Sequence, residues 1–118
     1  METLDEILNG FSVMIIQSGG ELYLPIQVAS EFIQKCYDNN LAISGIDFVH
    51  IINNRIMPVS PINSMDASLL LGENRIWRNS ILECKNFALS VIQKELERDS
   101  EQFCNFVVLS ENDLPPIM

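Results

Sequence analysis

The chain has 118 residues, about the length of one average domain. Hydrophobic residues make up 47% and charged residues 19%, with only five Gly and five Pro, which excludes a disordered, collagen-like or low-complexity chain. The 16 acidic and 7 basic side chains give a net charge of -9, so the electrostatic field repels nucleic-acid phosphates and anionic lipids. We therefore expect a compact protein with no nucleic-acid and no membrane partner, and a field that favours a basic partner.

The acidic residues are concentrated at the two ends of the chain. Residues 1–40 carry a net charge of -5, residues 41–98 are neutral, and residues 99–118 carry -4. Termini of small domains often lie close together. The ends therefore form either one acidic surface beside a neutral middle or two separate solvated segments.

The start of the chain and the cysteines indicate the compartment. No apolar run approaches the roughly 20 residues that span a bilayer, and the acidic first residues have the wrong charge for a signal peptide. Cys36, Cys84 and Cys104 are widely spaced and fall within apolar patterns, so we expect reduced, buried thiols. Both features predict a cytoplasmic protein.

The first 40 residues predict two helices. The Thr3-x-x-Glu6 spacing is that of a capping box and begins a short helix. Residues 12–17 form an apolar run that is either a strand or a buried connection, and Ser18-Gly19-Gly20 ends it. From Pro25, apolar pairs recur every four residues, which predicts an amphipathic helix ending at Asn39-Asn40.

The middle of the chain predicts a hairpin over about residues 43–59. β-branched and aromatic residues lead into Asn53-Asn54, and asparagine tolerates the positive φ angles of a tight turn. Pro58 and Pro61 either end the second strand or confine it to an edge, because proline has no N–H for the ladder. Residues 60–79 show no clean period and predict a long loop or a short helix, and loops of that length are often functional.

The last part of the chain predicts a helix and a strand. Ser80 and Glu83 have capping-box spacing, followed by a helical apolar stripe as far as about Arg98. Residues 103–109 are short and apolar enough for a central strand. The sequence thus predicts one α+β domain over residues 1–118, with a small, mainly antiparallel sheet packed by two long helices and a short N-terminal helix.

No motif predicts catalysis, a cofactor or a metal site. The chain lacks the glycine-rich phosphate-binding sequences, the Gly-x-Ser-x-Gly elbow and the His or Cys spacings of metal sites. The single histidine, His50, lies within a predicted strand, where a structural or surface function is expected. We therefore expect a protein that is not an enzyme and that has no cofactor.

Four residues are candidates for partner contacts. Asp47, Asp66 and Glu73 are the acids inside or beside the predicted hairpin and loop. Asp47, at a strand entry, must be paired, capping or exposed. Trp77 lies between two arginines, and tryptophan and arginine are common in binding hot spots. A single tryptophan in a small domain is also often a core residue, so both functions of Trp77 remain open.

The order of short motifs resembles the immunity protein 40 family of bacterial polymorphic-toxin systems. The resemblance covers about residues 3–110. In that family a Gly-Gly-Asp motif with apolar and aromatic residues after it stands where this chain has Gly45-Ile46-Asp47-Phe48-Val49, so Ile46 replaces the second glycine. The other matching segments are Leu4-Asp5-Glu6-Ile7-Leu8, Tyr23-Leu24-Pro25, Ile56-x-Pro58 and Trp77.

The resemblance implies a cytoplasmic antidote that binds a toxin domain in the producing cell and blocks it. A small acidic protein is suited to occupying a toxin surface, most readily that of a basic nuclease. The alternative is a noncatalytic accessory or ligand-responsive domain that pairs with itself across a sheet edge. An enzyme would need an acid pair such as Asp47 with Asp66 in a pocket. The sequence leaves open whether the protein is a monomer or a homodimer.

Overall fold

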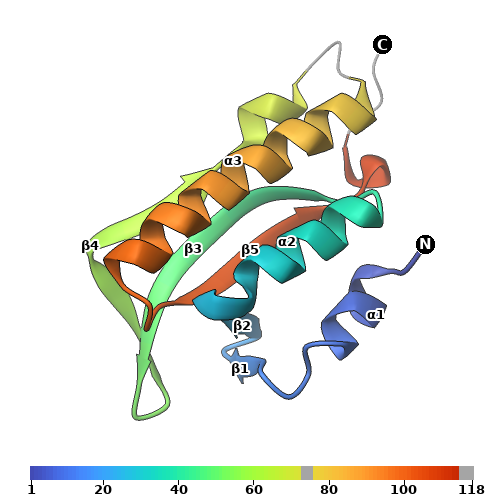
Figure 1. Cartoon of the computed structure of the whole chain (residues 1–118). Coiled ribbons are helices and arrows are strands. Elements are labelled where there is room, and N and C mark those ends of the chain that lie inside the picture. Colours follow the sequence, from blue (N-terminus) through green and yellow to red (C-terminus); the bar gives the residue numbers. More distant parts are fainter. Residues whose placement is uncertain (73–75, 115–118) are drawn as a thin grey trace.

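α-helices lie on one side of a five-stranded antiparallel sheet in the computed structural model (Figure 1). The structure describes residues 1–72 and 76–114. The strand order is β1-β2-β5-β3-β4, and the sheet curls into a partly closed barrel. The predicted α+β class and the single domain are confirmed.

The N-terminal helix forms as its capping box predicts. In α1 (Leu4–Asn9), the Thr3 hydroxyl accepts a hydrogen bond from the Glu6 N–H at 3.2 Å, and the Thr3 N–H donates to the Glu6 carboxylate at 3.3 Å. These contacts satisfy two of the N–H groups that a helix start leaves without partners.

The next segment contains one strand more than expected. β1 (Ile16–Ser18) pairs with β2 (Glu21–Pro25), and Gly19 and Gly20 make the turn between them at φ 58° and 81°. The apolar run at residues 12–17 is therefore in part a short strand, and Val13, almost fully exposed, is not in a buried connection. The sequence did not predict β2, because five residues directly before a helix show no recognisable alternation.

The second helix confirms the amphipathic pattern. A single 3-10 turn, η1 (Ile26–Val28), leads into α2 (Ala29–Asp38), which buries Phe32, Ile33 and Cys36 against the sheet. Asn40 ends the segment with φ 64°, in the left-handed region that asparagine tolerates.

The hairpin has the predicted turn and a longer second strand. β3 (Ala42–Ile52) and β4 (Arg55–Asp66) are joined by Asn53 and Asn54, both at positive φ. β4 is an edge strand, as the two prolines allowed, but it continues to Asp66, and its register jumps from Val49↔Pro58 to Phe48↔Asn63. The predicted loop at residues 60–79 is thus wrong over residues 60–66, because a bulge takes up the irregular residues and an edge strand tolerates prolines.

The last helix begins earlier than predicted. α3 (Trp77–Arg98) already includes Ser80, whose N–H donates to the Ile76 carbonyl at 3.0 Å and whose side chain is buried. The predicted capping box at Ser80 is therefore wrong, since its spacing also occurs by chance inside a helix. The apolar stripe is confirmed at Ile81, Cys84, Ala88 and Ile92. β5 (Phe103–Leu109) lies between β2 and β3, as expected of a central strand.

The core lies between the helices and the concave side of the sheet. Phe32 is at its centre and contacts two other rings, Phe11 edge-on at 5.7 Å and Phe106 at 4.7 Å between ring centroids. Cys36, Cys84 and Cys104 are free and fully buried, which confirms the predicted buried thiols, and burial raises the pKa of Cys36 and of Cys104 to about 12. Among the helices described, none is both long and apolar enough to cross a membrane.

Candidate functional site

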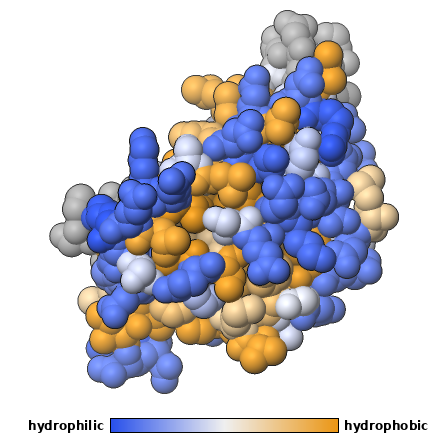
Figure 2. Space-filling model, in the orientation of Figure 1, coloured by the Kyte–Doolittle hydropathy of each residue, from blue (hydrophilic) through white to orange (hydrophobic). Residues whose placement is uncertain are grey.

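A groove of about 540 Å³ lies between the end of β4, the 3-10 helix η2 (Ser68–Leu71) and one flank of α3. Figure 2 shows hydrophobic side chains at the surface among hydrophilic ones on the side that carries the helices. The groove is lined by Asp66, Ala67, Leu69, Leu70, Glu83, Asn86 and Phe87. It is thus an apolar cleft with a carboxylate on the β4 side and another on the α3 side.

Two hydrogen bonds fix the wall of the groove that β4 and η2 form. The Asp66 carboxylate accepts from the Ser68 N–H at 2.9 Å and so turns the chain from β4 into η2. The Ala67 N–H donates to the Ser44 carbonyl of β3 at 2.8 Å. Ala67 and Leu71 are consequently buried, whereas Leu69 between them is 94% exposed. A leucine so exposed on a fixed turn contributes almost nothing to the core.

The opposite wall comes from α3. Glu83, Asn86 and Phe87 lie on the flank of the helix next to η2, and Phe87 is 40% exposed. The basic residues of the same part of the helix lie on the other flank. Arg78 and Lys85 contact the Tyr37 ring of α2, at 4.5 and 4.3 Å from its centroid. The helix thus has a basic flank against α2 and an acidic, apolar flank at the groove.

A hydrogen bond favours the ionised form of Asp66. The hydrogen bond from Ser68 lowers the pKa of the Asp66 carboxyl below its ordinary value of 3.8, so this group is ionised at neutral pH. Among the residues that line the groove, Asp66 and Glu83 are the charged ones, and both are acidic. The groove therefore combines apolar surface with negative charge.

The structure brings two of the four sequence candidates onto one face. Asp47 lies opposite Ser64 and Asp66 opposite Gly45, so the two aspartates are diagonal neighbours on the same face of the β3–β4 pair. Such positions lie about 7–8 Å apart. Both side chains are exposed, and Asp66 but not Asp47 lines the groove. Of the three states open to Asp47, the structure has the exposed one.

The other two candidates lie differently. Trp77 is the first residue of α3 rather than a loop residue, and it is only 6% exposed, with its indole N–H donating to the Asn40 carbonyl at 3.1 Å. This is the core position that the sequence left open for it. Glu73 lies outside the residues that the structure describes.

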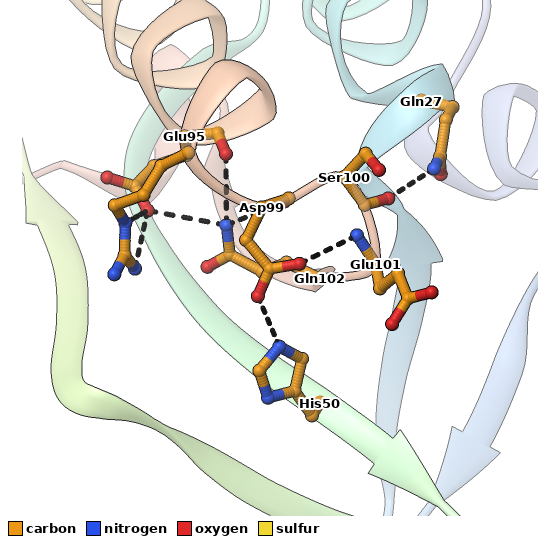
Figure 3. Close-up of polar contacts among 8 residues, drawn as sticks. Gln27, His50, Glu95, Asp99, Ser100, Glu101 and Gln102 are labelled. Carbon is orange, nitrogen blue, oxygen red and sulfur yellow. Dashed lines mark hydrogen bonds and ion pairs between the residues drawn. The ribbon is translucent and has the colours of Figure 1, made fainter.

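A second polar cluster, at the opposite end of α3, was missed by sequence reasoning (Figure 3). Gln102 is fully buried, and its amide N–H groups donate to the Glu95 carbonyl, the Glu95 carboxylate and the Asp99 carbonyl at 3.0–3.3 Å. Its Oε1 is buried and has no hydrogen-bond partner in the described part of the chain. His50 of β3 contacts Asp99 at 2.5 Å, so the lone histidine joins the sheet to the connection between α3 and β5.

This cluster stabilises the fold rather than forming an open site. Asp99 also accepts from the Glu101 N–H at 2.9 Å, and these two contacts lower the pKa of the Asp99 carboxyl. The signal that could have found the cluster is weak, because a glutamine and an aspartate after a helix are ordinary loop residues. Within residues 1–72 and 76–114, no group of three or more His, Cys, Asp or Glu is arranged to hold a metal ion.

Comparison of the chain with known protein families, with curated proteins and with solved structures finds no match.

Proposed function

We propose that this chain is an immunity protein of a bacterial polymorphic-toxin system, which binds a partner toxin domain in the cytoplasm and blocks it sterically. The order of motifs along the sequence suggests this class. The structural observation that supports it is the groove in which exposed Leu69 and Phe87 lie beside the carboxylates of Asp66 and Glu83.

The physical basis of the proposal is the free energy that a partner would gain by burying apolar side chains that the fold leaves exposed. Burying a leucine or phenylalanine side chain stabilises a complex by about 1.5–3 kcal/mol. Leu69 gains almost none of this within the fold, because it is 94% exposed. The net charge of -9 accelerates encounter with a basic partner such as a nuclease. A steric blocker needs neither a cofactor nor a catalytic group.

Calorimetric titration tests the proposal. The purified protein is titrated with the C-terminal domain of the large toxin polypeptide encoded beside it, at low and at high salt. Tight binding near one-to-one, with loss of the toxin's activity, is the expected result, and weaker binding at high salt would show that charge contributes. Absence of binding at both salt concentrations would overturn the proposal.

The second candidate function is an accessory domain that acts as a homo-oligomer. The observation in its favour is β4, an edge strand near whose turn Ile52 and Met57 are exposed. Exposed edges with apolar side chains can pair with a second copy. Sedimentation equilibrium together with the toxin titration separates the two candidates, because this one requires a stable dimer and no toxin binding.

A further inference from the structure

We propose that the groove between η2 and α3 receives an apolar side chain of the toxin domain that is flanked by lysine or arginine. This inference rests on the proposed function and specifies the contact through which it works. A volume of about 540 Å³ lies within the range of clefts that enclose small ligands, so one large aliphatic or aromatic side chain can enter it.

The apolar part of the occupant follows from the lining. Leu69, Leu70 and Phe87 present carbon surface, and Leu69 and Phe87 are exposed before any partner binds. Side chains that fill such a cleft and exclude water are the usual hot spots of an interface.

The basic part follows from where the two charges lie. Asp66 extends from the end of β4 and Glu83 from α3, so a cation on either side of the inserted apolar group meets a carboxylate. Among the residues that the structure describes, the nearby bases of α3, Arg78 and Lys85, contact Tyr37 on the other flank rather than these carboxylates. An acidic segment, a phosphate backbone or an anionic lipid would meet repulsion at the same place.

Synthetic peptides test this chemistry without the toxin. The probe is a short helical peptide in which turns of leucine alternate with turns of lysine. One matched control replaces all leucines by serine, and the other replaces all lysines by glutamate. Fluorescence anisotropy measures the binding of each, and amide NMR shifts locate it. We expect the leucine–lysine peptide to bind at least about ten-fold more tightly than either control. The largest shifts are expected at Ala67, Leu69 and Phe87.

Variants of the protein assign the binding to the groove. Leu69→Ser should remove the preference for leucine, and the double variant Asp66→Asn with Glu83→Gln should remove the preference for lysine. Asparagine retains a carbonyl oxygen that can accept the bond from Ser68, so the turn into η2 is kept. Val13→Ser and Glu97→Gln are the matched controls, because both residues are exposed on other parts of the surface. Equal binding of the leucine and serine peptides, or equal losses in the control variants, would overturn the inference.

The same variants separate this inference from the proposed function. If the toxin domain binds the wild type and all variants alike, the protein is an antidote that uses another face, and the groove proposal fails. If the wild type binds the peptide as expected but not the toxin domain, the proposed function fails and the groove keeps its ligand chemistry.

Discussion

Polar and acidic residues lie near both ends of α3, but their surroundings differ. At the C-terminal end, Gln102, Glu95 and Asp99 are joined to one another and to His50 by hydrogen bonds. At the N-terminal end, Glu83 and Asp66 line a groove beside exposed apolar side chains. Polar groups stabilise the fold at one end and face solvent at the other.

The difference shows which residues the fold needs. Pairing a buried polar group matters to the fold, because leaving one unpaired costs about 1–3 kcal/mol, and the buried Gln102 amide N–H groups donate to Glu95 and Asp99. Leu69 and Glu83 are exposed and carry no such requirement, so changes at these two positions should leave the fold intact. Substitutions at the C-terminal end of α3 should therefore lower stability, and substitutions of Leu69 or Glu83 should affect binding alone.

The largest effect is expected for Gln102→Glu. Gln102 is fully buried, and a carboxylate in its place would face the three acceptors to which its amide now donates. We expect the free energy of unfolding at pH 7 to fall by about 3 kcal/mol or more, measured by urea unfolding with Trp77 fluorescence. The loss should shrink in acid, because burial raises the pKa of a carboxyl group and the neutral form returns. Gln102→Leu is the control, and an equal loss in both variants at pH 7 would show that the charge has no effect.

An intermediate effect is expected for Trp77→Phe at the other end of α3. Phenylalanine keeps an aromatic ring in the core but loses the hydrogen bond to the Asn40 carbonyl, which should cost about 1 kcal/mol. Circular dichroism is the measurement, since the variant has no tryptophan. Binding of the proposed toxin partner should stay unchanged, because Trp77 is 6% exposed. Weaker toxin binding without a loss of stability would instead make Trp77 an interface anchor.

Local patterns predicted the fold where the residues involved are close in sequence. The Thr3–Glu6 capping box, the Asn53-Asn54 turn and the apolar stripes of α2 and α3 depend on neighbours a few residues apart. The predicted ends of strands and helices were wrong where contacts between residues far apart in the sequence determine them. β4 continues beyond Pro58 because β3 pairs with it across a bulge, and α3 begins at Trp77 because the indole is buried and bonded to Asn40.

The candidate site was predictable only in part, for the same reason. The sequence selected Asp66 as an acid in an irregular region, and this residue lines the groove. Leu69 and Phe87 looked like ordinary apolar residues, since composition does not reveal which leucine is left outside the core. His50 and Asp99 are 49 residues apart, and only the approach of β3 to the end of α3 brings them together.

A smaller, pH-dependent effect is expected for Asp99→Asn. The pKa of Asp99 is lowered in the folded protein by the Glu101 N–H and by His50, so the ionised group stabilises the fold above its ordinary pKa of 3.8. This contribution is lost as the pH falls through the lower, folded-state pKa. The variant should therefore be less stable than the wild type at pH 7, and the two should converge in acid. Thermal unfolding of both proteins, measured from pH 7 down into acid, tests this prediction. A stability difference between variant and wild type that stays the same at every pH would contradict the prediction.

The smallest effect on stability is expected for Leu69→Ser. This variant tests most directly whether groove residues contribute to the fold. Leu69 is 94% exposed on η2, so its loss should change the free energy of unfolding by no more than about 0.5 kcal/mol, as for most surface positions. The control is Leu71→Ser, two residues along the same turn but buried, where a cavity and an unpaired hydroxyl should destabilise the protein by about 2 kcal/mol or more. Urea unfolding of both variants measures the contrast. If Leu69→Ser were as destabilising as Leu71→Ser, the leucine would belong to the fold, and the groove would not be free to bind a partner.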